Sequence, residues 1–244
     1  MKLGIITDIH SNIIALNEVL KEFKKIKIDK IICCGDIIGI GPNPEEVIQA
    51  LMQFNDKLIA VRGNHEKYLL DGLPVNVHDD KRNMSLEEIQ NHKWTQSRIS
   101  EQSKKFLGNL PTYKTIEIEN KKIFLIHYPM NEEGEYKEHI KNPTFEEDKK
   151  MFSEANFDIY VYGHTHVACT NNSSNEWFIN VGALGCPLQS NMANAGVLDI
   201  KDDKINFKQL AIPYNINKVI KEIKKLIDNP LLFAIYFAVA FALV

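Results

Sequence analysis

Seven side chains of the kinds that bind divalent cations each follow or end a short apolar run in this sequence. They are Asp8, His10, Asp36, Asn64, His127, His164 and His166. The apolar runs are typical of buried strands, so these side chains stand at predicted strand ends. Because sites in open α/β sheets form at the carboxyl ends of strands, we expect the seven to meet at one edge.

The number and type of these side chains indicate more than one metal ion. Seven oxygen and nitrogen ligands exceed what one four-coordinate ion uses. They suit two divalent ions about 3.5–4 Å apart, with one carboxylate bridging and water completing the shells. Since no thiolate belongs to the set, these ligands fit a structural zinc or iron–sulfur site less well than Mn²⁺, Fe, Zn²⁺, Ni²⁺ or Co²⁺ in a two-ion site. Mn²⁺ is the favoured ion, and the other four are alternatives to it. A single Asp-x-His or His-x-His pair is commonly part of a turn or a helix cap. Here five separate segments each carry a candidate ligand after a predicted strand, which favours a metal site.

The elements that must position these ligands alternate along the first part of the chain. Residues 3–7, 30–34 and 58–61 are predicted strands, and residues 11–26 and 44–54 are predicted helices. This alternation predicts right-handed βαβ units and a substantially parallel sheet. Further on, residues 115–119 and 122–127 are typical of a hairpin. The remaining predicted strands are 158–162, 176–181, 196–200 and 204–209.

We expect one catalytic domain over residues 1–214, with a helical cap insertion at about 66–111. Residues 215–244 then form an amphipathic helix and an apolar tail. The uncharged stretch 231–244 is shorter than the roughly 20 residues that a spanning helix needs. The favoured interpretation is a tail packed on its own domain or on a second copy in a homo-oligomer. A membrane-surface anchor, through the basic helix and the tail, and an altered C-terminus are the alternatives.

Composition excludes some classes of function. The chain has 244 residues with 29 Lys and Arg against 32 Asp and Glu, a formal net charge of −3. This balance argues against a strongly basic nucleic-acid binder, and a hydrophobic fraction of 44% is typical of a folded globular protein. Four cysteines without CxxC spacing, and a first segment unlike a secretory signal, lead us to expect reduced thiols and a cytoplasmic location.

The ordered segments resemble the calcineurin-like metallophosphoesterase superfamily over residues 3 to about 210. The motifs are Asp8-x-His10, Gly35-Asp36, Gly63-Asn64-His65-Glu66, His127 and Gly163-His164-x-His166. Within that superfamily, the run from Gly39 to Pro44 and the segment Lys93-Trp94-Thr95 resemble the small prokaryotic phosphodiesterase branch. That branch includes diadenosine-tetraphosphate hydrolases.

The resemblance implies an α/β (α+β) fold, a four-layer double β-sandwich flanked by helices with a small helical cap insertion. It also implies how the ligands divide between the ions. One ion would be held by Asp8, His10, Asp36 and His166, and the other by Asp36, Asn64, His127 and His164, with Asp36 bridging. Phosphoprotein phosphatases of the superfamily carry an arginine shortly after Gly-Asp, where this chain has Ile37-Ile38-Gly39. Its absence weakens the case for phosphoprotein substrates.

The expected reaction is hydrolysis of a phosphodiester or a nucleotide phosphoanhydride by in-line attack of a metal-bridging hydroxide. Two cations can lower the pKa of a bridging water toward ~7. His65 is the candidate catalytic residue, as general acid or hydrogen-bond donor at the leaving oxygen. Glu66 either orients a neighbouring group or is a helix-start carboxylate. Arg62 either projects near the site or pairs with a surface carboxylate.

Three further histidines, His78, His92 and His139, are expected to lie off the site, with His78 as a candidate contact for the leaving group. The expected partner is a small phosphoester or nucleotide. A phosphomonoesterase is the second enzyme hypothesis, and a nuclease is disfavoured by the negative net charge. The non-enzymatic alternative is a protein-binding scaffold of the same fold, as in the retromer subunit whose site has degraded. Retention of all seven ligands and His65 counts against that alternative.

Overall fold

The computed structural model describes residues 1–73, 84, 86–132, 134–153, 156–188 and 191–226. The apolar tail at 231–244 and His78 therefore lie outside the described residues. The division at residue 214 stays a prediction.

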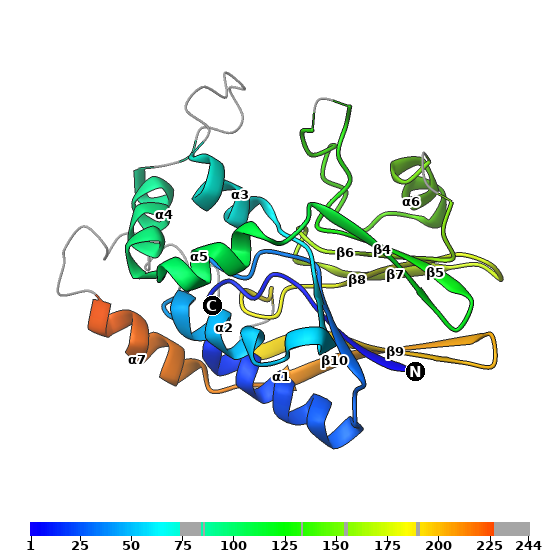
Figure 1. Ribbon diagram of the computed structural model, residues 1–244, viewed down its shortest axis with the longest axis horizontal. Helices are drawn as coiled ribbons and strands as arrows, with labels where there is room; N and C mark the ends of the chain where they lie inside the picture. Colours follow the sequence, from blue (N-terminus) through cyan, green and yellow to red (C-terminus); the bar gives the residue numbers. More distant parts are fainter. Residues whose placement is uncertain (74–83, 85, 133, 154–155, 189–190, 227–244) are drawn as a thin grey trace.

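The first of two five-stranded sheets has the strand order β10-β9-β1-β2-β3 (Figure 1). Strands β1, β2 and β3 run parallel, while β9 and β10 are antiparallel and close one edge. Its strands are β1 (Lys2–Ile6), β2 (Lys30–Cys33), β3 (Leu58–Ala60), β9 (Met192–Lys201) and β10 (Lys204–Pro213). The predicted βαβ alternation is confirmed in this parallel core.

The second sheet has the order β4-β5-β6-β8-β7. Here β5, β6 and β8 run parallel, and β4 and β7 are antiparallel edge strands. Its strands are β4 (Tyr113–Ile118), β5 (Lys121–Ile126), β6 (Ile159–Tyr162), β7 (Ala168–Asn172) and β8 (Trp177–Val181). Three strands in each sheet run parallel, while antiparallel strands form both outer edges of the second sheet and one edge of the first.

Apolar side chains form three separate layers of core. In β1, Leu3 and Ile5 face the second sheet, whereas Ile6 faces the helices, as expected for side chains that alternate along a strand. The outer face of the second sheet buries aromatic rings such as Tyr160 and Phe178. Two stacked sheets flanked by helices confirm the α/β fold that the resemblance implies.

Helices cover the outer faces of both sheets (Figure 1). They are α1 (Ile13–Ile26), α2 (Pro44–Met52), α3 (Asn64–Asp71), α4 (Leu86–Arg98), α5 (Glu101–Gly108), α6 (Phe145–Met151) and α7 (Ile216–Leu226), with a short 3₁₀ turn, η1 (Asn55–Lys57). Helix α1 is capped by Asn12, whose Oδ1 accepts from the Ala15 N–H at 3.0 Å. Helix α7 buries Val219 and Ile223 in the first core layer. In the part of the chain that the structure describes, no helix is both long and apolar enough to cross a membrane.

Two elements differ from the sequence-based expectation. Helix α6 was not expected, although Thr144 and Glu147 form the reciprocal capping box that marks a helix start. Strand β7 was also not expected, because its residues are polar and largely exposed at a sheet edge. The segment predicted to be a helical insertion does hold α3, α4 and α5, which contact one another.

Candidate metal centre

The candidate ligands come from the carboxyl ends of strands in both sheets. From the first sheet, Asp8 and His10 follow β1, Asp36 follows β2, and Asn64 begins α3 after β3. From the second sheet, His127 follows β5, and His164 and His166 follow β6. The site therefore forms only where the ends of two sheets meet.

Tight backbone turns aim these side chains. Five of the seven have φ in the left-handed region, namely Asp8 (52°), His10 (44°), Asp36 (49°), His164 (72°) and His166 (60°). Residues other than glycine are uncommon there and cost of order 1–3 kcal/mol each. The surrounding fold must hold these turns, and such strain is concentrated at functional sites.

Two glycines allow the strand ends to approach closely. A side chain at Gly163 would collide with Thr7 and with the carboxylate of Asp8. A side chain at Gly63 would collide with the carboxylate of Asp36. Glycine beside the ligands thus permits the contact between segments.

The first group of candidate ligands is Asp8, His10 and His166, whose ligand atoms lie within 4.8 Å of one another. The Nε2 atoms of His10 and His166 are 2.9 Å apart. Asp8 Oδ1 lies 3.4 Å from His166 Nε2 and 3.8 Å from His10 Nε2. This oxygen is buried and has no hydrogen-bond donor, so an anionic acceptor faces two imidazole nitrogens, as a cation site requires.

The second group is Asp36, His127 and His164, also within 4.8 Å of one another. Asp36 Oδ2 lies 3.2 Å from His127 Nε2, and His127 Nε2 lies 3.1 Å from both His164 Nδ1 and Asn64 Oδ1. Asp36 Oδ2 also lies 3.9 Å from His10 Nε2, in the first group. Asp36 thus stands between the two groups. The oxygen and nitrogen donors of both fit divalent cations.

The tautomer of His127 suits ligation. Its Nδ1 is 2.7 Å from the backbone oxygen of Cys34, so Nδ1 donates and Nε2 faces Asp36 and Asn64. A backbone acceptor on the far nitrogen is the usual way in which a protein orients a metal-binding histidine.

Electrostatics divide the cluster into charged and neutral members. Burial opposes ionisation of Asp8 and Asp36, but the imidazoles of His166 and His127 respectively outweigh it and hold both carboxyl pKa values below their usual range. Burial likewise opposes charge on His127, yet Asp36 raises its pKa to about 9. For His166, Asp8 and then Cys186 overcome burial and raise the pKa to about 11.

The other two imidazoles are neutral. Burial, then the charge of His166, lowers the pKa of His10 to about 3. Burial, then the charge of His127, lowers the pKa of His164 to about 3 as well. Without metal, each group therefore pairs one carboxylate with one imidazolium beside one neutral imidazole.

Glu66 fixes the loop that carries Asp36. It is fully buried, and its two oxygens accept the backbone N–H groups of Asp36, Ile37, Ile38 and Gly63 at 2.7–3.1 Å. The structure supports both sequence interpretations, because Glu66 caps the first turn of α3 through Gly63 and also orients the loop after β2. Burial, then the charge of Asp36, raises the pKa of Glu66 to about 7 against the lowering effect of these donors.

His65 lies at the rim of the cluster. Its backbone N–H donates to Asp36 Oδ1 at 2.9 Å, and its Nε2 lies 3.9 Å from Asp36 Oδ2. Its side chain is 14% exposed, so the ring reaches the open side of the site. A side chain at Gly39 would occupy the position of the His65 ring.

The expectation that His92 and His139 lie off the site is wrong. The His92 ring, from α4, lies 4.9 Å from that of His65, and burial lowers its pKa to about 4. His139 Nε2 lies 2.8 Å from His164 Nε2. Tyr136 stacks on His164 at 5.0 Å. Nothing in the sequence around His92, His139 or Tyr136 indicated that these residues lie near the ligands.

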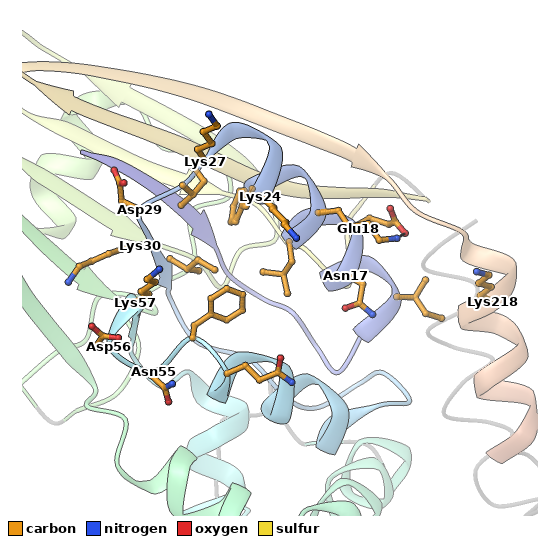
Figure 2. Close-up of a pocket in the computed structure, with 18 residues that line it drawn as sticks. Asn17, Glu18, Lys24, Lys27, Asp29, Lys30, Asn55, Asp56, Lys57 and Lys218 are labelled. Atoms are coloured by element: carbon orange, nitrogen blue, oxygen red, sulfur yellow. Dashed lines mark hydrogen bonds and ion pairs between the residues drawn. The ribbon is translucent and has the colours of Figure 1, made fainter.

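A cavity of about 860 Å³ lies at the other end of the strands. Figure 2 shows it between α1 and the segments that lead into β2 and β3, with Lys24, Lys27, Lys30 and Lys57 around it. None of the candidate ligands lines it. Because those ligands follow the carboxyl ends, this groove is separate from the candidate metal centre.

Comparison with known proteins places this geometry in a family. A family profile described as "Calcineurin-like phosphoesterase superfamily domain" matches residues 1–203. "Uncharacterized protein MJ0912" of Methanocaldococcus jannaschii is 28% identical, covering 91% of this chain and 92% of that protein. "Phosphodiesterase YfcE" of Escherichia coli is 24% identical, covering 82% of this chain and 88% of that protein.

The fold is shared with a solved structure over nearly the whole chain. Hypothetical protein PH1004 from Pyrococcus horikoshii superposes with a TM-score of 0.81 at 17% identity. The match covers 96% of this chain and 97% of that one. At this identity the likeness concerns the fold alone.

Proposed function

Since the chain belongs to the calcineurin-like phosphoesterase superfamily, we propose that it is a dinuclear metal-dependent phosphoesterase. Its substrates are phosphodiesters or nucleotide phosphoanhydrides. The observation that carries the proposal is the position of Asp36, whose Oδ2 lies 3.2 Å from His127 Nε2 in one ligand group and 3.9 Å from His10 Nε2 in the other. One carboxylate so placed can serve two cations at once.

The seven candidate ligands form two sets that share Asp36. Asp8, His10, Asp36 and His166 hold one ion, and Asp36, Asn64, His127 and His164 hold the other. Two bound divalent ions supply a strong nucleophile at neutral pH and neutralise charge on the phosphoryl oxygens. Mn²⁺ is the favoured ion for these donors, which include no thiolate.

His65 acts on the leaving group. Its backbone N–H is bonded to Asp36, and its ring faces the open rim, where the leaving oxygen of a phosphate at the two ions would lie. It donates a proton or a hydrogen bond to that oxygen, a contribution typically worth about 10²–10⁴-fold in rate.

The loop after Asp36 favours diesters over phosphoprotein monoesters. Ile37 and Ile38 are buried in the first core layer at 0% and 1% exposure. That stretch therefore presents apolar side chains to the core and no cation to the second negative charge of a monoester dianion.

The test is hydrolysis of bis-p-nitrophenyl phosphate by metal-stripped protein during titration with Mn²⁺, beside Asp36→Asn and His65→Ala. We expect Mn²⁺-dependent activity that Asp36→Asn abolishes. His65→Ala should retain bound metal and lose about 10²-fold or more in kcat. Faster hydrolysis of mono-p-nitrophenyl phosphate would instead favour a phosphomonoesterase. Bound metal without hydrolysis of either ester would favour the protein-binding scaffold.

A further inference from the structure

A second cavity, of about 570 Å³, adjoins the candidate metal centre. It lies at the seam where α3 and the end of β3 meet the β4–β5 hairpin, and Arg62, Gly63 and Tyr136 line it. Tyr136 also stacks on His164, with ring centroids 5.0 Å apart, and Gly63 immediately precedes Asn64. The cavity and the ligand cluster thus share a wall, and its volume is within the usual range for small-molecule sites.

Three cations line this cavity, namely Arg62, Lys67 and Lys137, and the Nζ of Lys137 donates to the backbone oxygen of Met151 at 2.9 Å. Arg62 donates through Nε to Thr112 Oγ1 at 3.3 Å, which fixes the guanidinium. Asp71 and Glu132 also line the cavity. Yet none of the ion pairs within the described ranges involves Arg62 or Lys67. A guanidinium held in place and not paired is suited to bind a phosphate through its planar fork.

The same cavity offers an aromatic face. Tyr113 is 59% exposed, unusually so for a large ring. Its ring packs against that of Phe124, with 5.7 Å between the centroids and 33° between the planes, and Phe124 stacks on Phe157. A supported, exposed ring of this kind is a stacking surface for a flat heterocycle.

We propose that this cavity binds the nucleoside end of a nucleotide substrate. A phosphate that is not cleaved pairs with Arg62 and Lys67, and the base lies on Tyr113, while the scissile phosphate occupies the candidate metal centre. The inference rests on the proposed function and selects from its substrates the nucleotide phosphoanhydrides, since a simple diester carries no second phosphate for Arg62.

The experiment is calorimetric titration of metal-free protein with ADP, with adenosine and inorganic phosphate as half-ligands. We expect ADP to bind more tightly than either half. Arg62→Gln removes a charge-assisted bond to phosphate, so it should weaken ADP binding by about 10-fold or more. The affinity for adenosine, which has no phosphate, should stay unchanged. Tyr113→Ala should weaken both ADP and adenosine by about 5-fold or more. Lys208→Gln, an exposed cation outside the cavity, is the matched control and should bind ADP as the parent protein does.

Several results would overturn the inference. ADP that does not bind, or that binds Arg62→Gln as tightly as the parent, would show that the cavity does not hold the second phosphate. Tighter binding of a short-chain phosphatidylglycerol than of ADP would replace the nucleotide by a lipid. Thermal melting confirms that each variant is folded, and Arg62→Lys, which keeps the charge but not the fork, should bind ADP with intermediate affinity.

The two proposals fail separately. If the protein does not hydrolyse bis-p-nitrophenyl phosphate but binds ADP in a way that depends on Arg62, the result would count against the proposed function alone. Mn²⁺-dependent hydrolysis without ADP binding would overturn the inference and leave the proposed function standing.

Discussion

The two sheets contribute unequal halves to the candidate metal centre. The first sheet supplies every oxygen ligand, together with His10, and the side chains of Asp8, His10 and Asp36 are almost fully buried. The second supplies imidazoles only, and of these His166 is 24% exposed. The oxygen half is thus enclosed by protein, whereas in the second half His127 is buried and His164 and His166 are partly exposed.

Backbone bonds link the loops of both halves, and the halves differ in the side chains that support them. Backbone bonds link the loops of the first half, with Asp8 N–H donating to Gly35 O at 3.1 Å and His10 N–H to Asp36 O at 3.0 Å. Glu66 adds four further bonds. In the second half, Gly163 N–H donates to His127 O at 2.8 Å, and the side chains of His139 and Tyr136 contact His164. The comparison indicates that the first half is the more buried of the two, while elements of both halves line the cavity beside the centre.

Asp36→Asn tests whether the two halves share one ligand. We expect both ions to be lost, with activity falling by about 10³-fold, because each ion is worth several kcal/mol of transition-state stabilisation. Metal analysis after dialysis measures the effect. His166→Ala is the control and should lose one ion only. Retention of both ions by Asp36→Asn would contradict the shared ligand.

The pH dependence of metal binding tests the charge pattern of the halves. In the metal-free protein at pH 7, His127 and His166 are protonated, because their pKa values are raised to about 9 and 11. His10 and His164, with pKa values near 3, are already neutral. Each cation must therefore displace one proton, so affinity rises with pH by about tenfold per unit, up to about pH 9 for the ion at His127 and about pH 11 for the ion at His166. Calorimetry in buffers of different ionisation enthalpy counts these protons, and binding without proton release at pH 7 would contradict the assignment.

Glu66→Gln tests the rigidity of the first half. The amide places N–H groups against buried N–H donors, which should cost about 1–3 kcal/mol of unfolding free energy. For a domain of this size the melting temperature of the metal-free protein should fall by about 5 °C. Glu46→Gln, an exposed carboxylate in the first turn of α2, is the control. Equal melting temperatures for the two variants would show that the hydrogen bonds to Glu66 do not stabilise the fold.

His139→Ala tests the side-chain support of the second half and has the smallest expected effect. Without the contact on His164 Nε2, the affinity of the site for one of the two ions should fall by about 10-fold. Because His139 is exposed, the melting temperature of the metal-free protein should stay the same. Lys141→Ala, also exposed in the same segment, should change neither quantity. Unchanged affinity for both ions in His139→Ala would remove its positioning role.

The sequence predicted each of the six parallel strands because buried strands are short apolar runs. The antiparallel edge β7 was not predicted, because an edge strand exposed to water lacks such a run. The start of α6 had a local signal in Thr144 and Glu147, and its capping box could have been found.

The sequence alone determined which residue types stand at strand ends, and so the chemistry of the candidate site. Tertiary structure decided which of them meet: Asp36 between two groups, His139 on His164, His92 beside His65, and Arg62 without an acidic partner within the described residues. These contacts join segments far apart in the chain. Periodicity reports only which face of an element is buried, whereas a contact between distant loops depends on how the two sheets pack.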